Sequence, residues 1–105
     1  MKSTVVTLGL VITLAAGPAV ADELALATKS GCMGCHKPDA KLVGPSFKDI
    51  AGKYKKTANA VNVLAARVKA GSKPGEPLNW GAVAMPPNQA SEDEIRTVVK
   101  WILTH

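Results

Sequence analysis

The chain has 105 residues with two Trp, one Tyr and one Phe, so it can form one small domain whose core of side chains alone would be thin. Lys and Arg number 13 against 8 Asp and Glu, which gives a mildly basic net charge of +5. No recognition motif and no basic stripe interleaved with aromatic residues accompanies that charge, which argues against a nucleic-acid-binding protein.

The first 21 residues have the pattern of a secretory signal peptide. Lys2 is followed by an apolar run over residues 5–16, a Gly-Pro breaker and the small residues 19–21 of a cleavage site. The run is too short to span a bilayer comfortably, although a retained anchor stays the alternative because the positive region is thin. We therefore predict a signal peptide over residues 1–21 that is removed on export, and one domain over residues 22–105 without a stable membrane anchor.

A short helix is expected over residues 24–30, preceded by two acidic residues and closed by Gly31. The pentapeptide Cys-Met-Gly-Cys-His follows and contains both cysteines of the chain. On one helical turn Cys32 and Cys35 face the same side and can add across the two vinyl groups on one edge of a haem. His36 is then held under the iron and can supply the proximal ligand. The motif predicts covalent attachment of one haem c per chain.

Two other chemistries use a Cys-x-x-Cys pair. A zinc site needs a second Cys or His pair at ligand spacing, and beyond the pentapeptide the sequence offers only His105. A thioredoxin-like dithiol needs a βαβ context, and no segment before Cys32 alternates like a strand. A flat and mostly apolar haem would also fill the centre of a chain that has few aromatic residues. Cofactor and core are therefore expected to be the same object.

The middle of the chain predicts a loop and two helices. Residues 37–45 contain turn signals and predict an irregular loop. A short helix is expected over residues 47–54 with Ser46 as its N-cap, and a longer one over residues 57–70 that Gly71 ends. Apolar residues recur at helical spacing in the longer helix: Val61, Leu64, Ala65 and Val68.

Residues 71–89 hold four of the seven prolines and three glycines, too many for regular structure. They also contain Trp80 and Met85, so we expect a loop organised around a functional site. A capping box over residues 91–94 starts a C-terminal helix, and the whole chain predicts a single all-α domain wrapped around the haem. The apolar stripe of the C-terminal helix is Ile95, Val98, Val99 and Ile102.

A second axial ligand decides whether the iron carries electrons or keeps an open position for chemistry. Met1 is lost with the signal peptide, Met33 lies inside the attachment turn, and His105 ends a capped helix. Met85 remains, and the two prolines after it stiffen the backbone that carries its thioether, which lowers the entropy lost on ligation. Asn88 can approach the sulfur from three residues further on. A peroxidase or gas-binding protein with an open position stays the alternative, as does a Met85 that only fills the core.

Further segments complete a recognisable pattern: Val43-Gly44-Pro45, Phe47-Lys48-Asp49, residues 67–72, Asn79-Trp80-Gly81, Met85-Pro86-Pro87-Asn88 and Lys100-Trp101. With the pentapeptide, they resemble the short bacterial class I cytochromes c of the cytochrome c551 type over nearly all of residues 22–105. The resemblance implies the small all-α class I cytochrome c fold and a monomeric, soluble, periplasmic carrier of single electrons in respiration or denitrification, with no catalytic residues. Implied partners are redox proteins such as a nitrite reductase, a terminal oxidase or a peroxidase, and an upstream quinol-oxidising complex.

The resemblance also implies roles for four further residues. The Pro45 carbonyl would accept a hydrogen bond from the outer ring nitrogen of the axial histidine. Trp80 and Arg67 would donate to a haem propionate, and Asn88 would hydrogen-bond the sulfur of the axial methionine.

Some positions depart from the family pattern. Ala27 stands where relatives often have an aromatic residue that packs on the terminal helix, and residues 73–77 look longer than in short relatives. Ala82 and Ala84 stand where prolines are frequent. Nine lysines could form a docking patch for an acidic partner or be scattered over the surface: Lys29, Lys37, Lys41, Lys48, Lys53, Lys55, Lys56, Lys69 and Lys73.

Overall fold

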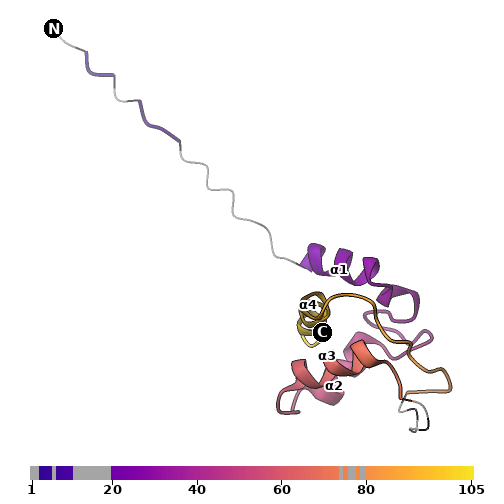
Figure 1. Ribbon diagram of the computed structural model, residues 1–105. Helices are drawn as coiled ribbons and strands as arrows, with labels where there is room; N and C mark the ends of the chain where they lie inside the picture. The colour runs from indigo at the N-terminus through magenta and orange to yellow at the C-terminus, as the bar shows by residue number, and fades with distance from the viewer. Residues whose placement is uncertain (1–2, 6, 11–19, 74, 76–77, 79) are drawn as a thin grey trace.

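The computed structural model describes residues 3–5, 7–10, 20–73, 75, 78 and 80–105. The described part of the chain contains helices and no strand, which confirms the all-α prediction (Figure 1). Its helices are α1 (Val20–Lys29), α2 (Phe47–Tyr54), α3 (Ala60–Ala70) and α4 (Glu92–Ile102), with a 3-10 turn, η1 (Cys32–Gly34), after α1.

The acidic pair Asp22 and Glu23 indicates a helix start at residue 24, but α1 already begins at Val20. It therefore crosses the predicted cleavage position after residue 21, and most of the predicted signal peptide lies outside the described residues. Removal of residues 1–21 stays a prediction. Among the helices of the described residues, none has the length and apolar character needed to cross a membrane.

Helix α2 has the bounds that the sequence predicts, since the Ser46 hydroxyl caps it by accepting a hydrogen bond from the Asp49 N–H at 3.0 Å. Helix α3 begins three residues later than predicted. The backbone of Asn59 is left-handed, with φ of 55°, and the Thr57 N–H donates to the Tyr54 carbonyl in a turn instead of starting a helix. Gly71 ends α3 as expected, with φ of 72°.

Helix α4 begins with the predicted capping box, in which Ser91 and Glu94 satisfy each other's backbone N–H groups. It packs against α1, α2 and α3 and is the central element of the fold (Figure 1). All four residues of the predicted stripe are buried, and Trp101 beside them is buried as well. Amphipathic spacing thus identifies the face of α4 that meets the other three helices.

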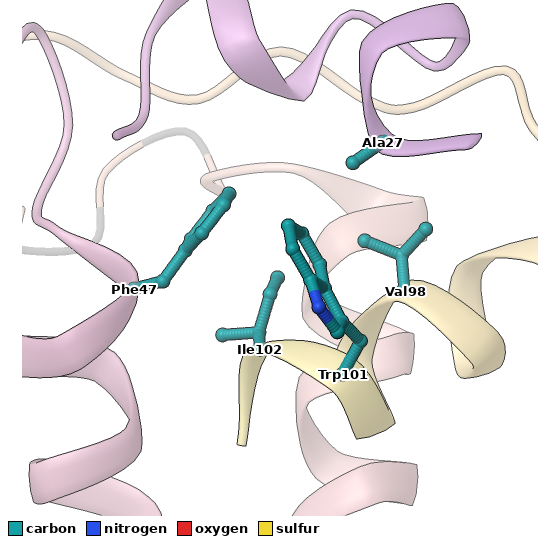
Figure 2. Close-up of a cluster of buried hydrophobic side chains, with 5 residues drawn as sticks. All are labelled: Ala27, Phe47, Val98, Trp101 and Ile102. Atoms are coloured by element: carbon teal, nitrogen blue, oxygen red, sulfur yellow. The ribbon is translucent and has the colours of Figure 1, made fainter. Parts of the chain in front are cut away.

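One cluster of buried side chains joins α1 and α2 to α4, and Figure 2 shows Ala27 facing the Trp101 ring. Ala27, which departs from the pattern that the resemblance implies, is fully buried. The aromatic mass comes from α2 and α4 instead, since the rings of Phe47 and Trp101 meet edge to face with centroids 5.4 Å apart. The full cluster is Ala27, Phe47, Val98, Trp101 and Ile102.

A second cluster joins α3 to α4 on the other side of the terminal helix. It consists of Leu64 and Ala65 from α3 with Ile95 and Val99 from α4. Residues of both clusters line one cavity, so the two parts of the core face a common space.

Candidate functional site

A cavity of about 730 Å³ lies inside the domain, and residues from all four helices and from the loops line it. Cys32, Cys35 and His36 of the pentapeptide line this cavity, and so does Met85 of the loop before α4. The structure therefore brings together the four residues from which the sequence predicts haem attachment and ligation. Sequence separation alone could not show that the pentapeptide and Met85 share one cavity.

The attachment turn is built from backbone hydrogen bonds. Gly31 has φ of 82°, a left-handed conformation that lets the chain turn sharply from α1 into η1. The N–H groups of Cys35 and His36 both donate to the Cys32 carbonyl, at 3.2 Å and 3.0 Å. This single turn presents both half-buried cysteines to the cavity as free thiols.

Burial raises the pKa of the Cys32 thiol, which disfavours the thiolate that zinc binding or rapid thiol exchange requires. Among the described residues there is also no group of three or more His, Cys, Asp or Glu side chains that could hold a metal ion by themselves. The raised pKa argues against a reactive dithiol, and the missing ligand group argues against a zinc site within the described residues.

The ring of His36 is fixed from three sides. Its Nδ1 lies 2.7 Å from the Pro45 carbonyl oxygen, which can only accept, so Nδ1 carries the proton and Nε2 keeps a lone pair for a metal. The ring stacks on Phe47 with centroids 5.8 Å apart and planes 24° from parallel. A Cβ added to Gly44 would lie 2.5 Å from the His36 Cε1 atom, so a side chain there would displace the ring.

Met85 is held by the segment that follows α3. Its N–H donates to the Ser72 hydroxyl at 2.9 Å, and its carbonyl accepts from the Ser72 N–H at 2.8 Å. Gly71 lies so close that a Cβ there would be 2.7 Å from the Met85 carbonyl oxygen and 2.6 Å from the Pro87 nitrogen. From the sequence, Gly71 is expected only to end α3, and Ser72 has no expected role. The position of Ser72 directly after the glycine that ends a helix is the only sequence signal for its role.

Asn88 ties the methionine loop to two other elements. Its N–H donates to the Val68 carbonyl at 3.1 Å, and its Nδ2 donates to the Ser30 carbonyl at 3.0 Å. Its Oδ1 accepts from the Ala90 N–H at 2.9 Å. The Nδ2 group carries a second hydrogen, so a hydrogen bond to the Met85 sulfur is compatible with these contacts and stays a prediction.

Arg67 on α3 and Trp80 in the loop also line the cavity, Arg67 exposed and Trp80 half-buried. Their contacts with a haem propionate stay predictions. The ammonium of Lys53 lies 4.8 Å from the centroid of the Trp80 ring, a contact that sequence reasoning missed because it joins residues of different elements.

His105 is not among the residues that line the cavity, which argues against it as the second ligand. Its ring packs edge-on against Phe47 and Trp101, at centroid distances of 5.5 Å and 4.8 Å. Its Nδ1 donates to the carbonyls of Trp101 and Ile102 at the end of α4. His105 thus belongs to a cluster of rings with Phe47 and Trp101, and Phe47 in turn contacts His36.

The residues of the cavity fit a haem. Two thiols can form thioether bonds, an imidazole nitrogen and a thioether sulfur are ligands of the kinds that haem iron takes, and the remaining lining is mostly apolar. The volume lies within the roughly 300–1,000 Å³ of ordinary cofactor sites.

Comparisons with known proteins agree with this chemistry. The family model described as cytochrome c matches residues 17–105. The cytochrome c-551 of Azotobacter vinelandii is 49% identical over 75 residues, which are 71% of this chain and 87% of that protein. The cytochrome c-551 of Pseudomonas aeruginosa is 43% identical over 91 residues, 87% of this chain and 84% of that protein. The crystal structure of wild-type Nitrosomonas europaea cytochrome c552 has a TM-score of 0.71 and 40% identity, and the match covers 77% of this chain and 96% of that one.

Proposed function

Because this chain belongs to the cytochrome c family and binds a covalent haem c, we propose that it is a periplasmic carrier of single electrons with His36 and Met85 as the axial ligands. The observation that carries the proposal is the shared cavity, which both cysteines, the imidazole and the thioether line together. A bound haem supplies the one-electron couple between Fe(III) and Fe(II).

The protein's own part is to hold two different ligands rigidly. Pro45 fixes the ring orientation and the tautomer of His36. The hydrogen bond at Nδ1 also raises the basicity of the imidazole, which makes Nε2 a stronger electron-pair donor to iron. Ser72 holds the backbone of Met85 through two hydrogen bonds, so the backbone that carries the thioether is fixed by the protein itself. Since side chains would occupy both axial positions, no position is left for a substrate, which favours a carrier over an enzyme.

The surface near the cavity suits transient docking. Val43, Leu78 and Val83 line the cavity and are 45%, 39% and 66% exposed, so they give an apolar rim. Lys29 and Lys73 line the same cavity and are exposed. We infer that a larger redox protein with acidic residues around its own electron entry site docks here. Such a partner is a nitrite reductase, a terminal oxidase or a peroxidase as acceptor, or a quinol-oxidising complex as donor.

The test of the proposal is replacement of Met85 in the haem-loaded protein. Met85→His should keep the haem low-spin and lower the reduction potential, because imidazole stabilises Fe(III) better than a thioether does. For a one-electron couple, each shift of about 59 mV changes the equilibrium tenfold. Met85→Ala should open the iron to cyanide and peroxide. Both are measured by spectroelectrochemical titration and by cyanide binding.

The control is Met33→Leu, because Met33 lies in the attachment turn and packs on the buried cluster around Trp101. It should leave potential and cyanide exclusion unchanged. If Met85→Ala also leaves both unchanged, Met85 is not the axial ligand and another side chain closes the sixth position. A wild-type protein that itself binds cyanide would instead favour an open-site haem protein over the carrier.

A further inference from the structure

Lys53, on the last turn of α2, places its ammonium over two aromatic rings. The nitrogen lies 4.8 Å from the centroid of the Trp80 ring and 5.6 Å from that of Tyr54. Both distances are within the range in which a cation is attracted to the face of a ring, and Trp is the strongest partner. Among the described residues, both cation–ring contacts belong to this one lysine.

Both rings line the haem cavity, but they belong to different elements. Tyr54 is the last residue of α2, whereas Trp80 lies in the loop between α3 and α4, just before Gly81 with φ of 144°. Lys53 therefore connects a regular helix to an irregular loop at the rim of the cavity.

The hydrogen bonds that close this loop lie at some distance along the chain from Trp80. The two hydrogen bonds between Ser72 and Met85 close its neck, so the chain leaves and returns at one place. They fix Met85 but do not by themselves orient Trp80, which lies five residues before it. A contact from a residue outside the loop is the direct way to fix the indole ring.

We propose that Lys53 is a positioning residue that holds the Trp80 indole at the rim of the cavity and places a positive charge beside it. The inference rests on the proposed function and on the contact between the Trp80 indole N–H and a haem propionate that the family resemblance implies. A cation there favours the ionised propionate, and its positive potential favours Fe(II) over Fe(III). Lys53 thus sets both the direction of the donor and the charge around the anion that the donor meets.

The experiment compares three variants of the haem-loaded protein. Lys53→Met keeps the aliphatic stem and removes the charge, whereas Lys53→Arg keeps the charge and can stack on the indole. Lys56→Met is the matched control, because Lys56 is an exposed lysine two residues beyond the end of α2. The readouts are hydrogen exchange of the Trp80 indole N–H, followed by NMR in the reduced protein, and the reduction potential.

In Lys53→Met we expect the indole N–H to exchange about two- to fivefold faster, because a cation–ring attraction at an exposed site corresponds to a factor of this size. We also expect a lower reduction potential. Lys53→Arg should restore slow exchange, and Lys56→Met should behave like the wild type. Unchanged indole exchange in Lys53→Met would overturn the inference, and so would equal effects of Lys53→Met and Lys56→Met. The proposed function would still stand in either case if the wild type is redox-active. A wild-type protein without a reversible one-electron couple would overturn both.

Discussion

Gly44 shows how one missing side chain sets the position of a ligand. The His36 ring occupies the space in which a Cβ of residue 44 would lie, and the Gly44 N–H donates to the Cys35 carbonyl at 2.7 Å. The next residue, Pro45, supplies the carbonyl that orients the ring. Of these two consecutive residues, Gly44 thus leaves room for the imidazole and Pro45 fixes its orientation by a hydrogen bond.

Gly44→Ala should therefore displace the His36 ring and destabilise the holoprotein by about 1–3 kcal/mol, the usual cost of an added methyl group in a tightly packed place. Chemical denaturation measures the loss, and the reduction potential reports the altered ligand. Gly52→Ala is the control, because the Cβ it would add has no neighbour within 4 Å apart from the adjacent backbone of α2, in which the residue lies. It should stabilise the protein by about 0.5–1 kcal/mol. Equal behaviour of the two variants would contradict the argument.

At the scale of residues the sequence predicted the groups that offer chemistry, and the resemblance implied Pro45 and Asn88 as their supports, but two further supporting groups were not predicted. The pentapeptide and Met85 were identifiable because their types and spacing are chemically unusual. Ser72 and the carbonyl of Ser30 were not, since a serine and a backbone oxygen have no distinguishing pattern. Their partners, Met85 and Asn88, lie 13 and 58 residues away along the chain.

Among the elements, α4 has the strongest local determinants. The Ser91 hydroxyl accepts from the Glu94 N–H at 3.2 Å, and the Glu94 carboxylate accepts from both the hydroxyl and the N–H of Ser91. Hydrogen bonds from the Ser91 side chain, and then from its backbone, lower the pKa of Glu94 below its ordinary value of 4.5. The ionised carboxylate is therefore part of the helix start.

A depressed pKa in the folded state means that Glu94 stabilises the fold fully above its unfolded pKa and loses that contribution as the pH falls through the folded pKa. The difference in unfolding free energy between wild type and Glu94→Gln should be constant above about pH 5.5 and shrink below about pH 4. Denaturant titrations at several pH values measure it. Glu92→Gln, an exposed carboxyl in the same turn, is the control; a difference for Glu94→Gln that does not vary with pH would refute the capping role of the charge.

The helices differ in how well sequence predicts their ends. Helices α2 and α4 begin at capping serines, and a cap is a contact between residues three apart, so the local sequence contains it. The start of α3 is different, because the left-handed backbone of Asn59 shortens it and nothing in residues 57–59 requires that conformation. The predicted start of α1 was also wrong, because acidic residues favour the first turn of a helix but do not prevent another turn before them.

On the scale of the whole molecule, the core and the site are one structure. Residues of both buried clusters line the cavity, including Phe47 and Val98 from one cluster and Leu64 and Ile95 from the other. Without a group between them, these apolar faces would meet water or collapse. The small number of aromatic residues offers no replacement for the missing contacts.

Removing the attachment chemistry should therefore remove the fold. Cys32→Ser combined with Cys35→Ser should give a colourless chain that is largely unfolded, because the remaining side chains cannot fill a cavity of about 730 Å³. Far-ultraviolet circular dichroism decides the matter. Native helix content in the haem-free double variant would show that the polypeptide packs without its cofactor.

The net charge of +5 gives a second expectation at this scale. If lysines steer docking, electron transfer to an acidic partner should slow as salt rises, because screening acts within about 10 Å at 0.1 M salt. Lys29→Gln should reduce both the rate and its salt dependence, since Lys29 lines the cavity. Lys100→Gln on α4 is the control and should do neither. A rate that is flat from low to high ionic strength would favour docking through the apolar rim alone.

Two hydrogen bonds beside the proposed ligands differ in how much chain must be present before they can form. The bond from His36 to Pro45 closes over 9 residues, whereas the bond from Asn88 to Ser30 closes over 58. Closing the longer loop costs more chain entropy, so the proximal half can assemble early and the distal half only after the C-terminal third has emerged. A chain that folds from its N-terminal end can therefore hold its cofactor on the His36 side before the methionine side has formed.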